Sequence, residues 1–198
     1  MNEALVRNAP HEKRGHLGAS MIGGACERKI WNKFHWADDD TSKAGGLKAQ
    51  EDGRHSEEVM ITRLQNTPGV ELSPLDENGK QFSYADGHFK GSADGIIYGL
   101  HHNPDVGHVW ENKCVNEKKF GVLFKLIMAN QSTALFEWDE EYYGQAQTYM
   151  HYLQLESHYL TVCTPGSRSE ISCITAYDPE AADYYKKRAV RIITSPKP

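Results

Sequence analysis

The sequence lacks the cysteine patterns that define several protein classes. Its 198 residues include only four cysteines, and no two of them form a Cys-x-x-Cys pair. This scarcity excludes a small disulfide framework and indicates neither a zinc ribbon nor a thioredoxin-like redox motif. We expect four free thiols. Cys163 and Cys173 lie symmetrically about a predicted hairpin turn and could face each other.

A long hydrophobic run is also missing. The longest apolar stretch, residues 120–129, is interrupted by Lys125, and a membrane helix needs about 20 apolar residues. Residues 1–20 carry Glu3, Arg7 and Arg14 and have no apolar centre, so no secretory signal is predicted. We therefore expect a cytoplasmic protein with no membrane partner, in a bacterial host if the chain is phage-encoded.

The chain has no excess of positive charge. It holds 22 Lys and Arg against 27 Asp and Glu, which gives a net charge of -5 and a pI near 6.0. These values argue against broad, nonspecific attraction to nucleic acid. The charge is uneven, however, because residues 1–35 contain six basic and three acidic residues, which leaves 16 against 24 for the remainder.

The residues that are present predict one α/β domain covering residues 1–198. At 39% hydrophobic and 25% charged residues, a chain of this length can bury about 70% of its unfolded surface. Helical periodicity predicts helices at 20–36, 47–66, 118–129, 139–155 and 178–193, with a polar loop at 38–46. Short runs between turn residues predict strands at 69–73, 81–85, 88–98, 108–115, 159–163 and 170–176, the first four forming a meander. We expect a central mixed sheet flanked by helices.

Three acids and one lysine share faces with apolar neighbours in these elements. Glu57 lies on the apolar face of its predicted helix, and Asp94 shares a face of its predicted strand with Ile96 and Tyr98. Glu111 and Lys113 lie on one face of the following strand. Because buried carboxylates are normally paired or bind metal, the set predicts a divalent-cation site of the oxygen-rich kind that Mg²⁺ prefers. The alternative is a group of surface charges, with Glu111 and Lys113 as a solvated pair.

Four motifs containing these residues follow one another in the chain. They are Gly53-x-x-x-Glu57, Ser92-Ala93-Asp94-Gly95, Glu111-Asn112-Lys113-Cys114, and the segment Tyr143-Gly144-Gln145-Ala146-Gln147-Thr148-Tyr149-Met150. In this order they resemble the motifs of the PD-(D/E)XK nucleases, specifically the branch of phage lambda exonuclease and RecB-like exonucleases. The resemblance covers residues 14–152 and implies a restriction-endonuclease-like core.

The resemblance implies a catalytic metal site. Asp94, Glu111 and the backbone carbonyl of Asn112 would hold Mg²⁺, with Mn²⁺ able to substitute. Glu57 would bind through water or hold a second ion, so that one or two ions are expected. Lys113 would orient or deprotonate the attacking water, and the outcome would be phosphodiester hydrolysis.

The resemblance also implies contacts with DNA. Gln145, Gln147 and Tyr149 would contact the substrate backbone or the active-site lysine. Arg14 and Ser20 would recognise a terminal 5′-phosphate, with Arg28 as the rival for Arg14 and a helix cap as the second reading of Ser20. Lys118 and Lys119 could contact the DNA backbone, although a solvated helix face explains them equally well.

Two features of relatives in this superfamily are not expected here. His55 lies two positions before Glu57, and the metal-binding histidine of some RecB-like nucleases has its place taken by Glu57. Cys26 resembles the first cysteine of an iron-sulfur cluster, but the C-terminal cysteines lack the cluster spacing, so no iron-sulfur cluster is predicted.

The function implied is a Mg²⁺-dependent DNA exonuclease, acting 5′ to 3′ on linear duplex DNA in phage-type recombination, repair or replication. The alternatives are a RecB-like single-strand exonuclease or endonuclease, and a catalytically inactive nuclease-fold DNA-binding module. By analogy with processive relatives, a homo-oligomer such as a trimer and a single-strand annealing recombinase are the further partners to consider.

Overall fold

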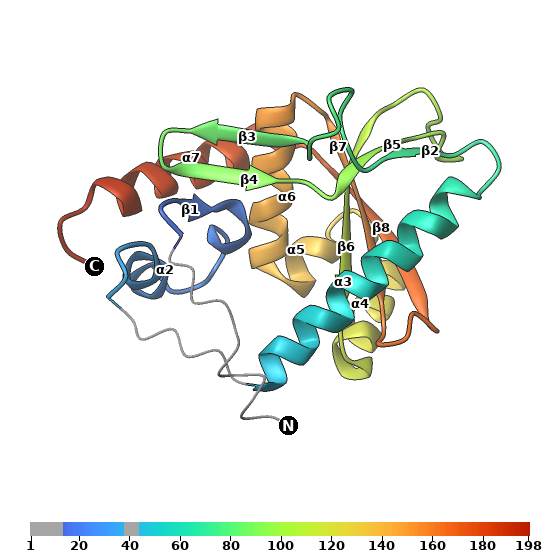
Figure 1. Cartoon of the computed structure of the whole chain (residues 1–198), viewed down its shortest axis with the longest axis horizontal. Coiled ribbons are helices and arrows are strands. Elements are labelled where there is room, and N and C mark those ends of the chain that lie inside the picture. The colour runs from blue at the N-terminus through green and yellow to red at the C-terminus, as the bar shows by residue number, and fades with distance from the viewer. Residues whose placement is uncertain (1–13, 38–43) are drawn as a thin grey trace.

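Two mixed β-sheets and the helices on their faces make up the computed structural model, which describes residues 14–37 and 44–198 (Figure 1). The expected α/β class is confirmed. The strands are β1 (Leu17–Gly18), β2 (Glu71–Ser73), β3 (Ser83–Asp86), β4 (Phe89–Ser92), β5 (Gly95–Tyr98), β6 (His108–Cys114), β7 (Ser157–Cys163) and β8 (Glu170–Ala176). The helices are η1 (Ala19–Met21), α2 (Glu27–Phe34), α3 (Ala44–Gln65), α4 (Glu117–Ala129), α5 (Ala134–Trp138), α6 (Glu140–Leu153) and α7 (Pro179–Thr194).

The larger sheet has the strand order β2-β5-β6-β7-β8, with β6 at its centre. β6 pairs antiparallel with β5 and parallel with β7, and the parallel connection runs through α4, α5 and α6. Such a crossover is what a parallel pair requires. The central position explains why the first five residues of β6 are all buried.

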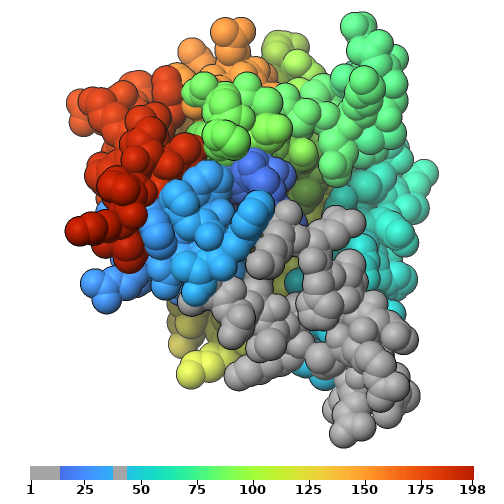
Figure 2. All heavy atoms as spheres, turned by 60° about the vertical axis from the view of Figure 1, so that its left-hand side comes forward, coloured from blue at the N-terminus to red at the C-terminus, as the bar shows by residue number. Residues whose placement is uncertain are grey.

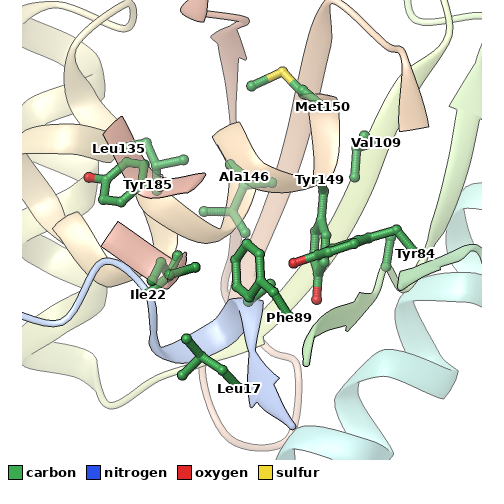
Figure 3. Packing of buried hydrophobic residues seen from close by; sticks show 14 of the residues in the cluster. Leu17, Ile22, Tyr84, Phe89, Val109, Leu135, Ala146, Tyr149, Met150 and Tyr185 are labelled. Atoms are coloured by element: carbon green, nitrogen blue, oxygen red, sulfur yellow. The ribbon is translucent and has the colours of Figure 1, made fainter. Parts of the chain in front are cut away.

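The two faces of β6 pack against different helices. Val109 belongs to the main apolar cluster, which includes Ala146, Tyr149 and Met150 of α6 (Figure 3). Trp110 belongs to a second cluster together with Met60 of α3. Because side chains alternate along a strand, Glu111 lies on the α6 side of the sheet and Asn112 on the α3 side.

The predicted strand 88–98 is wrong, because the structure divides it between two sheets. β4 joins the three-stranded sheet β1-β4-β3, while β5 begins at Gly95 in the five-stranded sheet. A Cβ on Gly95 would lie 2.8 Å from the carbonyl oxygen of Ser73, so the chain passes very close to β2 at this point. Apolar and polar residues keep alternating through the break, which hides it from periodicity. Asp94 therefore lies at the junction of the two sheets. The predicted four-strand meander does not form, because its strands are divided between these sheets.

The predicted helix 20–36 is also wrong at its start. Ser20 lies inside the short η1 and is exposed, and the α-helix begins only at Glu27. Gly23 separates the two because its backbone packs on the start of α6, where a Cβ would lie 2.1 Å from the carbonyl oxygen of Glu140. Ser20 thus does not cap this helix.

The remaining helices differ less from the prediction. α3 begins at Ala44, three residues early, and α5 was not predicted. Asp178 caps α7 by accepting from the amides of Glu180 and Ala181, and Pro179 is its first residue, as expected. Most of the predicted loop 38–46 lies outside the described residues.

The four cysteines are thiols, as expected, but Cys163 does not face Cys173. In the β7–β8 register Cys163 lies opposite Glu170 and Cys173 opposite Leu160. The actual neighbour of Cys163 is Cys114, its partner in the parallel β6–β7 pair. Among the described residues, no helix has the length and apolar character to cross a membrane.

The close contact at Gly23 generates a stability prediction. We expect Gly23→Ala to lower the free energy of unfolding by about 1–3 kcal/mol, because the new methyl group would overlap α6 backbone. Gly121→Ala is the matched control, since nothing lies within 4 Å of its Cβ position in α4, and it should stabilise by about 0.5–1 kcal/mol. Urea unfolding of both variants measures the difference, and equal stabilities would contradict the close packing.

Candidate active site

Asp94 and Glu111 lie side by side where β5 begins. The antiparallel register pairs Gly95 with Trp110, so the preceding and following residues, Asp94 and Glu111, face each other at the end of the ladder. The Asp94 carboxylate accepts a hydrogen bond of 2.9 Å from the backbone amide of Asn112. Since N–H and C=O of one strand residue point to the same side, the Asn112 carbonyl is also directed to the Asp94 side.

Glu111 is a buried carboxylate with only one of its oxygens in use. Its side chain is 2% exposed. Oε2 accepts from Lys113 Nζ at 2.5 Å and from Gln145 Nε2 at 3.2 Å, while Oε1 is buried and has no hydrogen-bond partner among the described residues. Burial and the neighbouring Asp94 raise the pKa of Glu111 to about 8, against the opposing effect of Lys113. A buried oxygen without a partner, beside a second carboxylate, fits a bound cation.

Lys113 supplies the positive charge of the site. Its side chain is 20% exposed, and its ammonium contacts Glu111 directly. Burial lowers the pKa of Lys113, but the charges of Glu111 and Asp94 raise it by more, so the net pKa lies above the usual lysine value. In its protonated form Lys113 is a donor of hydrogen bonds.

Glu57 faces the pair from α3. It is half-buried; burial and the charge of Asp94 raise its pKa, whereas Lys113 lowers it. No group of three His, Cys, Asp or Glu side chains within residues 14–37 and 44–198 is arranged to hold a metal ion. The arrangement instead offers two carboxylates, a carbonyl oxygen and a more distant third acid. Mg²⁺ accepts such a set because it keeps several waters in its shell.

Ser56 is a residue of the site that sequence reasoning missed. Its hydroxyl is buried, donates to the Gly53 carbonyl at 2.8 Å and accepts from Asn112 Nδ2 at 3.0 Å. Thr161 donates to Asn112 Oδ1 at 3.0 Å on the other side. These contacts fix α3 and its Glu57 against β6. His55, one residue earlier, is exposed.

Gln145 and Tyr149 connect α6 to both acids. Gln145 Nε2 contacts Glu111 Oε2 and also the Tyr149 hydroxyl, at 3.1 Å. The Tyr149 hydroxyl in turn donates to the Ser92 carbonyl at 2.7 Å, two residues before Asp94. Gly91 is required here because a Cβ would lie 2.5 Å from the Tyr149 ring. Tyr149 is 3% exposed, which makes it a residue that positions others and not a surface for substrate.

The structure does not support the substrate-binding role expected for Gln147. The side chain is fully buried on the opposite face of α6 from Gln145. Its Nε2 donates to the Ala176 carbonyl at 3.0 Å, and its Oε1 accepts from the Asp178 amide at 2.8 Å. Both halves of the amide thus hold the β8–α7 connection, and the fully buried side chain offers no surface to DNA.

Arg14 and Ser20 meet over Gly18 at the surface. A Cβ on Gly18 would lie 3.5 Å from Ser20 Oγ and 3.7 Å from an Arg14 guanidinium nitrogen. Gly18 pairs in register with Lys90 of β4. Burial, then Arg14 and Lys90, lower the pKa of His16. Lys90 is therefore a basic neighbour that the motifs did not reveal. Figure 2 shows residues 14–37 at the surface, beside α7 and below the β3–β4 hairpin.

The other expected DNA contacts are exposed or already paired. Arg28 is exposed on α2 and Lys118 on α4. Lys119 forms an ion pair of 2.5 Å with Asp139 at the start of α6. The structure thus brings Glu57, Asp94, Glu111, Lys113 and Gln145 together and leaves these three cations outside that group.

Several solved structures that are similar to this fold are exonucleases. The alkaline exonuclease LHK-Exo from Laribacter hongkongensis matches with a TM-score of 0.61 and 14% identity over 96% of this chain and 90% of that one. Its complex with dAMP gives 0.58 and 14%, over 91% and 87%. A phage related exonuclease from Haemophilus somnus 129PT gives 0.58 and 15%, over 96% and 88%. The fold implied by the nuclease resemblance is thereby confirmed.

The comparisons by sequence add nothing to this. No protein-family model matches the chain, and no curated protein matches it by sequence. What the structure shares with these exonucleases is the fold, and the roles of the residues rest on the geometry described above.

Two buried histidines near the site, His108 and His158, are held neutral. Burial, with Lys113 and His108 as further causes, lowers the pKa of His158 to about 3, and burial lowers that of His108. The unfolded chain binds a proton at each histidine near pH 6.5, so the folded state loses stability as the pH falls from 6.5 toward 3.

We expect His158→Gln to reduce this acid sensitivity. Between pH 7.5 and 5.5 the wild type should lose about 1.4 kcal/mol more of its unfolding free energy than the variant does. Urea unfolding at the two pH values measures the loss, with the exposed His55→Gln as control. An unchanged pH dependence in His158→Gln would show that His158 binds protons equally in the folded and unfolded states, and would contradict its lowered pKa.

Proposed function

We propose that this protein is a divalent-metal-dependent deoxyribonuclease that acts as an exonuclease. One observation carries the proposal: buried Glu111 lies opposite Asp94 and has one carboxylate oxygen without a hydrogen-bond partner among the described residues, with Lys113 on the other oxygen. Two acids and a lysine at one point are the groups that metal-assisted phosphodiester hydrolysis uses. The fold, which is that of the solved exonucleases, supports the same reaction class.

Asp94, Glu111 and the backbone carbonyl of Asn112 would hold Mg²⁺, or Mn²⁺ in its place. Glu57 would act through water or at a second ion. Bound there, the ion would offset charge on the scissile phosphate and lower the pKa of a coordinated water. No iron-sulfur cluster is proposed.

The protein's own groups prepare this site. Lys113, which carries a positive charge, donates a hydrogen bond to the attacking water or to a phosphate oxygen. Gln145 holds the Glu111 carboxylate in one orientation through Oε2, which leaves Oε1 for the ion. Tyr149 fixes Gln145 and the strand that leads to Asp94.

Linear duplex DNA, digested from its 5′ end, is the proposed substrate. Arg14 and Ser20 flank one point at the surface, and Lys90 lies in the adjacent strand, so a terminal 5′-phosphate has three donors there. Lys90 precedes Asp94 by four residues, which places the phosphate-binding group and the acids on one segment of chain. The dAMP complex of LHK-Exo supports a mononucleotide product. Phage-type recombination, repair or replication would use such an end-resecting activity.

The first test is digestion of end-labelled linear and circular DNA with Mg²⁺ and with EDTA. We expect Mg²⁺-dependent degradation of linear DNA only, and Lys113→Ala should lower the rate at least about 100-fold, because an ion-activated water loses its positioned donor. Lys187→Ala, an exposed lysine of α7, is the matched control and should retain full activity.

Four outcomes would contradict the proposal. Activity that survives EDTA would exclude the metal mechanism, and wild-type activity in Lys113→Ala would exclude this site. Degradation of circles would favour the RecB-like endonuclease alternative, whereas binding of DNA without any cleavage would favour a catalytically inactive module.

The second test concerns the 5′ end. Wild-type protein should digest 5′-phosphorylated duplex faster than 5′-hydroxyl duplex, and Arg14→Ala should remove this preference without slowing digestion of the 5′-hydroxyl substrate. Arg28→Ala, the rival position, should keep the preference. Equal wild-type rates on the two ends would rule out terminal-phosphate recognition, and loss of preference in Arg28→Ala alone would move it to α2.

A further inference from the structure

Tyr142 lies at the start of α6, and its ring contacts the side chains of two lysines from other elements. Lys113 Nζ lies 5.5 Å from the ring centroid, and Lys119 Nζ lies 4.5 Å from it. Both distances are within the range in which an ammonium is attracted to an aromatic face. None of the four nuclease-like motifs contains Tyr142, and its neighbour Lys113 belongs to the proposed catalytic group.

The position of the ring is fixed by Asp139. One oxygen of this carboxylate caps α6 by accepting from the amides of Glu141 and Tyr142, and the other holds Lys119 Nζ at 2.5 Å. Trp138 adds a hydrogen bond of 2.9 Å from Nε1 to the Lys119 carbonyl. Lys119 is thus neutralised and held in place, and its side chain restrains the ring that also faces Lys113.

The acids that neighbour Lys113 are also the proposed metal ligands. Glu111 and Asp94 attract its ammonium, but they are also the proposed ligands of a divalent ion. A bound ion would offset their negative charge and so weaken their attraction for the lysine. An aromatic ring differs because its negative face attracts an ammonium but offers no lone pair of the kind that a hard cation binds. The Tyr142 ring therefore attracts Lys113 without competing for the ion.

We propose that Tyr142 is a positioning residue for Lys113, whose ammonium it holds toward the acids by a cation–π contact. This inference rests on the proposed function. It predicts that the ring matters to the chemical step and that the hydroxyl does not. Binding of DNA in the ground state should be unaffected, because the contact acts on Lys113 and not on the substrate.

The test compares Tyr142→Phe with Tyr142→Leu on 5′-phosphorylated duplex DNA with Mg²⁺. Tyr142→Phe should keep kcat within about twofold, and Tyr142→Leu should lower kcat about 3- to 30-fold at unchanged KM, as expected for loss of a cation–π contact. Tyr184→Leu, which removes an exposed tyrosine of α7, is the matched control and should leave both constants unchanged.

A graded measurement separates this role from a purely structural one. Phenylalanines with one, two and three fluorine atoms at position 142 keep the ring's shape while weakening its negative face. We expect kcat to fall stepwise along this series with the thermal midpoint of unfolding unchanged. The series also answers the question if Tyr142→Leu fails to fold.

The outcomes distinguish the inference from the proposed function. Wild-type protein without Mg²⁺-dependent hydrolysis would overturn the proposed function itself. An active wild type with no trend along the fluorinated series, or with equal losses in Tyr142→Phe and Tyr142→Leu, would overturn only the role of Tyr142. A change confined to KM would do the same, because it would assign the ring to DNA binding.

Discussion

The buried carboxyl group of Glu111 is the constraint around which the site is built. Placing this carboxylate beside Asp94 in a buried environment is unfavourable, and burial together with Asp94 raises its pKa. The chain offsets the cost on one oxygen only, with Lys113 and Gln145, and leaves the other without a hydrogen bond. A structure that merely needed to bury β6 would place an apolar residue here. On the proposed function, the retained acid is explained by a ligand that supplies the missing partner.

Maintaining this geometry requires the two sheets to meet at Asp94. The polypeptide leaves β4 and enters β5 within two residues, and Tyr149 secures the turn through the Ser92 carbonyl. The ring fits only because Gly91 has no side chain, and β5 approaches β2 only because Gly95 has none. Helix α6, which carries Tyr149, also contacts the backbone at Gly23. This contact positions the N-terminal segment that carries Arg14 relative to the acids. Small residues at backbone contacts thus determine where the charged ones lie.

The sequence predicts the polar members of the site better than the path of the chain between them. Periodicity alone places Glu57, Asp94, Glu111 and Lys113 on inward faces, and the structure brings these four together. The break after Ser92 is invisible to the same reasoning, since alternation continues across it and only the close approach of a distant strand causes it. Ser56 and Lys90 are missed for a related reason: each matters through a partner far away in sequence, which local spacing does not report. The motif predicts that Gln147 binds substrate, whereas in the structure its side chain packs against β8 and holds the β8–α7 connection.

The net charge of -5 acquires a physical meaning from this arrangement. On the proposed function, ionised acids at the junction of the sheets would repel a DNA phosphate as long as no cation is bound, while Arg14 and Lys90 would attract one. On the proposed function, an ion at Asp94 and Glu111 removes the repulsion, so DNA and the ion should each bind more tightly in the presence of the other. Such coupling is reciprocal by thermodynamic necessity. An acidic nuclease of this design would therefore hold DNA strongly only where the metal is already in place, which confines tight binding to complexes that are ready to react.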